Sequence, residues 1–192
     1  MVISKDTCLG CFLGLALGDA LGAPYEGGLL ERLLWKFFAR TFIGEARWTD
    51  DTQMSIDLAE SILEYQCINP DDIAARFASS FHWTRGYGPA ASKLLKKISK
   101  GEDWRLANRS IYPDGSLGNG GAMRSPVIAL YCHDNFEQID KAATLASSIT
   151  HAHPLGIEGA VLISYATANA LLGVSSLEIL EDTFKRAQSD MY

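Results

Sequence analysis

The chain has 192 residues, of which 47% are hydrophobic and 21% charged, so it holds enough apolar material for one globular domain over residues 1–192. Its formal net charge of −6 argues against a general nucleic-acid binder and against a protein that binds anionic membranes. The four cysteines are too few and too scattered for a disulfide framework, which predicts free thiols and a cytoplasmic location.

The first predicted element is an apolar helix that starts near Cys8. We expect Cys8 and Cys11 to be buried free thiols within it. Glycines recur every four residues along it and predict one flat face that another backbone can approach closely: Gly10, Gly14, Gly18 and Gly22. The stretch resembles a signal peptide, but Asp6 precedes it and the apolar run stops at Asp19, which is short for a membrane span.

Pro24 is predicted to end this helix and to leave Glu26 on a loop directly beyond it. A carboxylate at such a place can act as a general base or as a metal ligand. The alternative is an ordinary solvated glutamate. The next segment, residues 29–40, is apolar with scattered charge and is expected to form another helix.

Residues 48–52 place two adjacent carboxylates between two hydroxyls, at the start of a helix predicted over 53–65. Carboxylate and hydroxyl oxygens are the donors that Mg²⁺, Ca²⁺ and Mn²⁺ prefer. The alternative is a helix cap, in which Thr49 or Asp50 accepts a hydrogen bond from the first turn. On these five residues alone, the cap is the commoner arrangement.

Helices are next predicted over residues 70–83, which start with Pro-Asp-Asp, and over 89–99. Between them, residues 85–89 place glycines on both sides of Tyr87 at a helix start. Such a segment can bring a backbone amide close to an anionic ligand, and the alternative is an ordinary turn.

A glycine-rich stretch over residues 114–124 leads directly into a predicted helix over 121–132. Exposed amides and a helix N-terminus would offset the charge of a phosphate there without side-chain cations. The stretch lacks the Gly-Lys-Ser/Thr ending of a Walker A loop and the preceding strand of a dinucleotide fingerprint. The alternative is a flexible surface loop.

Two histidines, His151 and His153, precede Pro154 and a further predicted helix. A zinc site lacks supporting ligands at a suitable spacing, so one histidine that contacts a ligand is the better interpretation. The remaining predicted helices cover residues 136–149, 154–172 and 175–188. Because strand-like alternation is scarce, we predict an all-α fold.

Taken together and in this order, residues 18–26, 48–52, 118–124 and 150–154 resemble the ADP-ribosylglycohydrolase family. The resemblance extends from about Cys8 to Gly173. It implies an all-α orthogonal multi-helix bundle with two Mg²⁺ ions in a cleft, with Mn²⁺ as an alternative metal. Its implied ligand is ADP-ribose or an ADP-ribosylated protein.

The resemblance also implies roles for individual residues. Thr49, Asp50 and Asp51 would be metal ligands, and Glu26 would act on the glycosidic bond. His151 would contact the substrate near the scissile ribose, and Tyr112 or Ile111 would stack on the adenine. The residues implied to hold the diphosphate and ribose are Gly88, Gly115, Ser116, Leu117, Gly118 and Asn119.

One departure from the family limits these expectations. The acidic motif Gly-x-Asp-x-Asp-Thr, which supplies further metal ligands in the family, has no counterpart among the late acids here. We therefore expect the N-terminal portion of the family fold, C-terminally incomplete, with exposed apolar surface that favours self-association. The expected activity is Mg²⁺-dependent hydrolysis of the N- or O-glycosidic bond of ADP-ribose on protein side chains or in related conjugates. The alternatives are a non-catalytic ADP-ribose binder and a structural protein.

Overall fold

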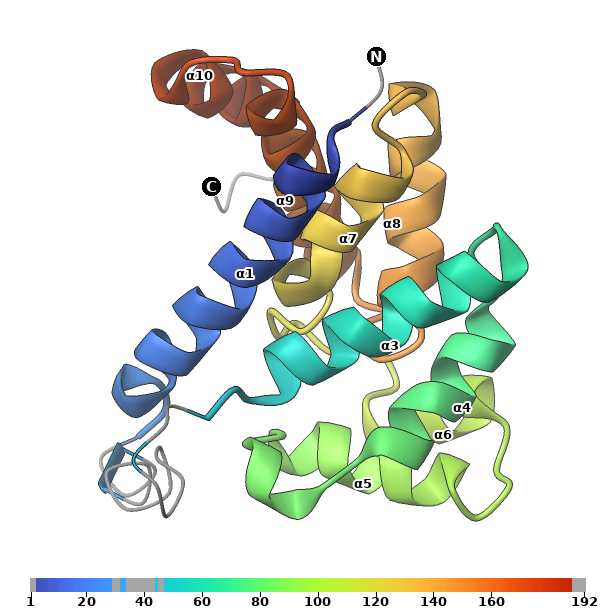
Figure 1. Cartoon of the computed structure of the whole chain (residues 1–192). Helices are drawn as coiled ribbons and strands as arrows, with labels where there is room; N and C mark the ends of the chain where they lie inside the picture. Colours follow the sequence, from blue (N-terminus) through green and yellow to red (C-terminus); the bar gives the residue numbers. More distant parts are fainter. Residues whose placement is uncertain (1–2, 29–31, 34–43, 45–46, 188–192) are drawn as a thin grey trace.

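The computed structural model describes residues 3–28, 32–33, 44 and 47–187, and the regular structure of this part is helical throughout, without a strand. The all-α prediction is therefore confirmed. Figure 1 shows the helices crossing one another at large angles. The α-helices are α1 (Lys5–Gly22), α3 (Asp50–Tyr65), α4 (Pro70–Ser80), α5 (Pro89–Ile98), α6 (Trp104–Ile111), α7 (Ser125–Tyr131), α8 (Ile139–Ser148), α9 (Pro154–Leu171) and α10 (Ser176–Arg186).

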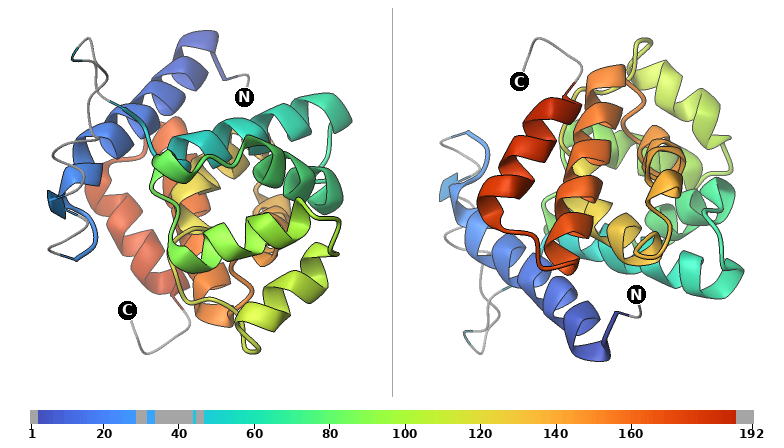
Figure 2. Two further views of the ribbon diagram at one scale, coloured as in Figure 1. Left: turned by 90° about the horizontal axis from the view of Figure 1, so that it is seen from below. Right: turned by 90° about the horizontal axis from the view of Figure 1, so that it is seen from above.

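The apolar core lies where α3 and α4 meet α7, α8 and α9. Helices α7 and α8 pack on α9, and α3 packs on α4 (Figures 1 and 2). The core side chains Leu58, Ile73, Phe77, Ile128 and Ile149 are all essentially inaccessible to solvent. Full burial of one such side chain stabilises a fold by roughly 1.5–3 kcal/mol. This core therefore holds residues 50–80 against residues 125–168.

Short polar side chains explain where several helices begin. Thr49 caps α3, Asn69 caps α4 directly before Pro70, and Ser175 forms a reciprocal capping box with Glu178 at the start of α10. Each cap satisfies an amide that has no partner inside its helix. These starts agree with the predicted ones to within a few residues. The helix expected over 29–40 lies almost entirely outside the described residues.

Two departures from the predicted helices concern short elements. Helix α6 was not predicted, because its eight residues are too few to show a clear period. The helix expected over 121–132 is a 3-10 turn, Ala122–Arg124, followed by the seven-residue helix α7. The last glycine, Gly121, is therefore followed by a tight turn, and the α-helix begins only at Ser125.

Helix α1 lies at the edge of the molecule (Figures 1 and 2). A side-chain carbon added at Gly10, Gly14 or Gly18 would meet nothing within 4 Å among the described residues, so no described segment makes the expected close approach there. Cys8 and Cys11 are free but only half-buried, which corrects the expectation of buried thiols. Four leucines of α1 are 52–60% exposed: Leu9, Leu13, Leu17 and Leu21.

The sequence predicts that the apolar stretch of α1 stops at Asp19, but in the structure the stretch continues beyond this residue. With the following 3-10 turn it runs over Lys5–Tyr25, which by length and composition alone is enough to cross a membrane. Most of this stretch lies on the surface of the described structure. Helix α10 exposes a second apolar row, Leu177, Leu180 and Phe184. These two rows are the surfaces that the expected self-association would use, and that expectation stays a prediction.

Candidate functional site

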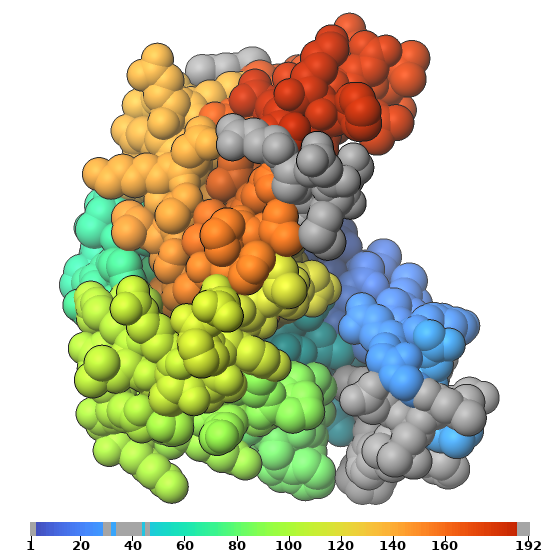
Figure 3. All heavy atoms as spheres, turned by 180° about the vertical axis from the view of Figure 1, so that it is seen from behind, coloured from blue at the N-terminus to red at the C-terminus, as the bar shows by residue number. Residues whose placement is uncertain are grey.

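A pocket of about 380 Å³ opens beside the N-terminal end of α3. From behind the molecule, Figure 3 shows a hollow between α1 and the segments around residues 85–125, with α3 deeper within it. The pocket brings together most of the site residues that the sequence singled out: Glu26, Asp50, Asp51, Gly88, Tyr112, Ser116, Gly118, Asn119 and His151. Ile111, the alternative to Tyr112, also lines it. Segments up to 125 residues apart therefore share one cavity.

Three of the predicted site residues do not line this pocket: Thr49, Gly115 and Leu117. The Thr49 side chain is buried, and its Oγ1 accepts a hydrogen bond of 3.3 Å from the Asp51 amide. The cap, which the sequence left open as an alternative, is thus the role that this hydroxyl has in the structure. Leu117 is 61% exposed. Gly115 packs against the backbone of Ala152 and His153.

Asp19 positions the start of α3, a role that the sequence alone did not reveal. Its buried Oδ2 accepts hydrogen bonds from the Thr49 amide at 2.8 Å and the Thr52 amide at 3.1 Å, and also from the Thr52 hydroxyl. These contacts tie α1 to the first turn of α3 and so orient Asp50 and Asp51. The only signal in the sequence was an acid within an otherwise apolar helix, which needs buried donors to be stable there.

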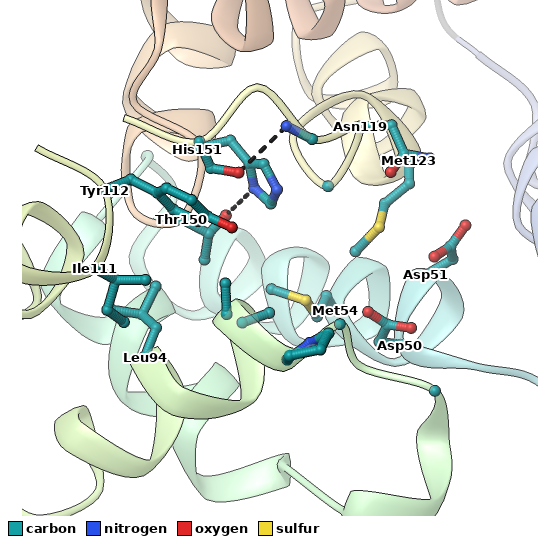
Figure 4. Close-up of a pocket in the computed structure, with 18 of the residues that line it drawn as sticks. Asp50, Asp51, Met54, Leu94, Ile111, Tyr112, Asn119, Met123, Thr150 and His151 are labelled. Atoms are coloured by element: carbon teal, nitrogen blue, oxygen red, sulfur yellow. Dashed lines mark hydrogen bonds between the residues drawn. The ribbon is translucent and has the colours of Figure 1, made fainter. Parts of the chain in front are cut away.

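Asp50 and Asp51 lie in a partly desolvated, acidic environment. Burial raises the pKa of each carboxyl to about 7, and the nearby Asp19 and Glu26 carboxylates add to the upward shift of both. In Figure 4 the two carboxylates lie at one end of the pocket, with His151 and Tyr112 at the other end. Adjacent carboxylates that burial and mutual repulsion disfavour as anions gain most from a bound cation.

The oxygen donors of the pocket fit a hard divalent cation, if water or ligand oxygens supply the rest of its coordination. No group of three or more His, Cys, Asp or Glu side chains within the described ranges is placed to hold an ion. Mg²⁺ does not need such a cage, because it commonly keeps several waters and takes one or two carboxylates together with oxygens of its ligand. Asp50 and Asp51 would supply the two carboxylates.

Arg124 is a fully buried cation beneath the site. Its guanidinium donates to the carbonyl oxygens of Gly120 and of Ala146, the latter at 2.9 Å, and to Thr150 Oγ1 at 2.8 Å. Burial lowers its pKa to about 10, while attraction from Asp50 and Asp51 opposes that shift. Arg124 does not line the pocket, so the expectation that a phosphate is held there without side-chain cations stays a prediction.

The glycine-rich loop is packed against the histidine segment, which explains its glycines. A side-chain carbon at Gly120 would lie 2.2 Å from His151 Cε1, and one at Gly118 would lie 2.9 Å from His151 Nε2. At Gly115 the backbone has φ +88°, and an added carbon would lie 2.1 Å from the His153 amide nitrogen. The loop is thus held closely on His151 and is not the flexible surface loop that was the alternative.

The two histidines have different roles. His153 caps α9, with its Nδ1 accepting from the Leu155 amide at 3.2 Å, whereas His151 lines the pocket. His151 is therefore the histidine placed to contact a ligand, and that contact stays a prediction. Burial, and then the charge of Arg124, lower the pKa of His151 to about 3, so its ring is neutral near neutral pH.

The segment 85–89 closes the pocket on the side of α5. The Arg85 guanidinium lies 4.4 Å from the centre of the Trp48 ring, and its Nη1 donates to the Trp48 carbonyl oxygen at 2.9 Å. Gly86 has φ +84°, which turns the chain so that Gly86 and Gly88 both line the pocket. Arg85 thereby fixes this segment to the residue that precedes Thr49.

His151 is expected to make the folding stability of the protein fall at acidic pH. Because its folded pKa of about 3 lies below the ordinary 6.5, the unfolded chain binds the proton more readily, and stability falls as pH drops from 6.5 towards 3. We expect His151→Asn to lose less stability than the wild type over this window, by up to ~1.4 kcal/mol per pH unit. Urea unfolding at a series of pH values measures this difference, and parallel curves for the two proteins would contradict it.

The sequence of this chain is similar to those of known proteins. The family model described as ADP-ribosylglycohydrolase matches residues 2–191. An uncharacterized protein of Archaeoglobus fulgidus is 33% identical over 195 residues, which cover 93% of this chain and 60% of that protein. ADP-ribosylhydrolase ARH3 of Mus musculus is 36% identical over 186 residues, covering 88% of this chain and 50% of the relative.

A solved structure agrees with these sequence matches. A chain described as "ADP-ribosylglycohydrolase-related protein complex" superimposes with a TM-score of 0.68 at 26% identity, covering 97% of this chain and 63% of that one. ADP-ribosylhydrolase ARH3 of Xenopus tropicalis is 32% identical, over 94% of this chain and 56% of its own length. The chain thus spans between half and two thirds of the length of these relatives.

Proposed function

Since the chain belongs to the ADP-ribosylglycohydrolase family, we propose that its pocket binds ADP-ribose and serves a Mg²⁺-dependent hydrolase. The bond cleaved would be the N- or O-glycosidic bond that joins ADP-ribose to a protein side chain, or its equivalent in a related conjugate. One observation carries the proposal: a single pocket holds Glu26, Asp50 and Asp51 together with the glycine-rich loop and His151.

The pocket suits the chemistry of that bond. Cleavage at the anomeric carbon of ribose develops positive, oxocarbenium-like character on the sugar. Glu26 is exposed to solvent and lines the pocket, so its carboxylate can activate a water or protonate the leaving oxygen. A divalent cation held by Asp50 and Asp51 would orient ribose hydroxyls and water and offset nearby negative charge.

The far end of the pocket suits a nucleotide. Tyr112 is 43% exposed and lines the cavity next to Ile111, so its ring can stack on a purine. Ser116, Gly118 and Asn119 line the same cavity and would contact the diphosphate that connects the adenosine to the second ribose. The volume of about 380 Å³ falls within the range of small-molecule sites.

A second candidate function is binding of ADP-ribose without turnover. It is favoured by the absence of a third acidic, histidine or cysteine ligand beside Asp50 and Asp51 in the described part of the chain. The two functions differ in catalysis but share the ligand. Binding and turnover therefore have to be measured separately.

The test follows release of ADP-ribose from serine- and arginine-linked ADP-ribosylated peptides, with Mg²⁺ and with excess chelator, beside calorimetry with free ADP-ribose. We expect binding and Mg²⁺-dependent release. Glu26→Gln should still bind ADP-ribose but lose roughly 10²–10⁴-fold in rate, the usual contribution of a general acid or base.

Three results would decide between the functions. Release that Glu26→Gln abolishes supports the hydrolase. Binding with no release from either peptide supports the non-catalytic binder. Neither binding nor release in the presence of Mg²⁺ contradicts both.

A further inference from the structure

A chain of hydrogen bonds links the buried guanidinium of Arg124 to the ring of His151. Arg124 Nη2 lies 2.8 Å from Thr150 Oγ1. Thr150 Oγ1 in turn lies 2.8 Å from His151 Nδ1, as Figure 4 shows. Thr150 is only 4% exposed and Arg124 only 1%, so the hydrogen bond between these two residues is shielded from water. The turn that carries Thr150 is fixed as well, because the Asn108 side-chain amide donates to the carbonyl oxygens of Ser148 and Ile149.

The donor and acceptor roles in this chain follow from chemistry. A guanidinium has only donors, so Thr150 Oγ1 must accept from Arg124. The hydroxyl proton is then available to His151 Nδ1, which accepts it only when Nδ1 carries no proton. If Nδ1–H donated to Oγ1 instead, the threonine proton would have no hydrogen-bond partner among the described residues, on a residue that is only 4% exposed.

A neutral imidazole without a proton on Nδ1 carries it on Nε2. A side-chain carbon at Gly118 would lie 2.9 Å from Nε2, so the lack of a side chain at this glycine leaves space beside the Nε2 edge. Within the described structure no protein acceptor contacts Nε2, and His151 lines the pocket together with Gly118 and Gly120. The Nε2–H group is therefore a donor available to a ligand.

We propose that Arg124 and Thr150 are positioning residues that fix His151 as a neutral Nε2–H donor to an acceptor oxygen of the bound ligand. The identity of the ligand rests on the proposed function, but the proton position belongs to the ligand-free protein. The arrangement keeps the Arg124 charge out of the pocket. His151 then offers a hydrogen bond without a positive charge that would compete with a cation for Asp50 and Asp51.

The proton position can be read directly by long-range ¹H–¹⁵N correlation of the imidazole nitrogens near neutral pH, without ligand. His151→Gln identifies the signals of this ring among the four histidines. We expect one dominant form, with protonated Nε2 and unprotonated Nδ1. Thr150→Val removes the hydroxyl at nearly constant shape and should produce a mixture of the two forms, whereas Thr150→Ser should keep the wild-type pattern.

A ligand measurement on the same proteins completes the test. We expect Thr150→Val to weaken ADP-ribose binding roughly tenfold and Thr150→Ser to leave it within about twofold, which corresponds to the loss of one hydrogen bond. A wild-type ring protonated on Nδ1 would overturn the proposal, even if Thr150→Val fails to fold. So would a pattern that Thr150→Val leaves unchanged. If ADP-ribose does not bind at all, the proposed function fails while the ¹H–¹⁵N result still decides the role of Thr150.

Discussion

Replacing Asp50 and Asp51 together by asparagine is expected to remove divalent-cation binding while leaving the fold intact. Both carboxylates line the pocket and are disfavoured as anions by burial and by Asp19 and Glu26. In the wild type, Mg²⁺ or Mn²⁺ at a hundred times its dissociation constant should stabilise the protein by about 2.7 kcal/mol. The double variant should show no such gain, and its metal-free form should be at least as stable as the wild type.

The same change should lower any hydrolysis of ADP-ribosylated peptides by roughly 10²–10³-fold, because a catalytic metal supplies several kcal/mol to the transition state. Thermal melting with and without Mg²⁺, and the release assay, measure the two effects. The matched control is Asp134→Asn with Glu137→Gln, which makes the same change in formal charge at two exposed carboxylates outside the pocket. Metal-induced stabilisation that survives in the double variant would show that Asp50 and Asp51 do not hold the ion.

Gly115→Ala is expected to destabilise the protein by at least about 3 kcal/mol and to abolish ligand binding. Its backbone conformation, φ +88°, alone costs an L-residue about 1–2 kcal/mol. The added carbon would also lie 2.1 Å from the His153 amide nitrogen and 2.4 Å from the Ala152 carbonyl carbon. Because both contacts are with backbone, the glycine-rich loop and the His151 segment would have to move apart.

Gly101 offers a matched control for this substitution. It has the same φ of +88°, but a carbon added there meets nothing within 4 Å. Gly101→Ala should therefore show only the conformational cost and leave the pocket unaffected. Chemical unfolding gives both free energies, and calorimetry gives both affinities for ADP-ribose. Equal destabilisation by the two substitutions would mean that the close contact between loop and histidine segment does not restrict Gly115.

Much of the helical framework could be predicted because its signals are local. The acids and Thr49 at the start of α3, Pro70 after Asn69, and Pro154 after His153 predict helix starts that lie within a few residues of the observed ones. The helix α6 was missed because Trp104–Ile111 is too short for its period to stand out. A close approach to the glycines of α1 could not be predicted, since spacing shows that a face is flat but not whether anything packs on it.

Some residues of the candidate site could be predicted from the sequence, and others could not. Glu26, Asp50, Asp51 and His151 were recognisable because each carries chemistry within a short motif, and the pocket does bring them together. Asp19 and Arg124 were not recognisable as site residues. Each acts through partners 22–33 residues away in the chain, such as Thr52 for Asp19 and Ala146 and Thr150 for Arg124.

The sequence by itself thus determined the all-α class, the order of the motifs and the chemical character of the pocket, because helix caps, periodicity and donor types depend on neighbouring residues. Only the tertiary structure decided that the Thr49 hydroxyl caps α3, that the glycine-rich loop packs against the ring of His151, and that a buried Arg124 bonds to both segments. Those outcomes depend on burial and on hydrogen bonds between distant segments, which make a buried charge stable only where the fold supplies its partners.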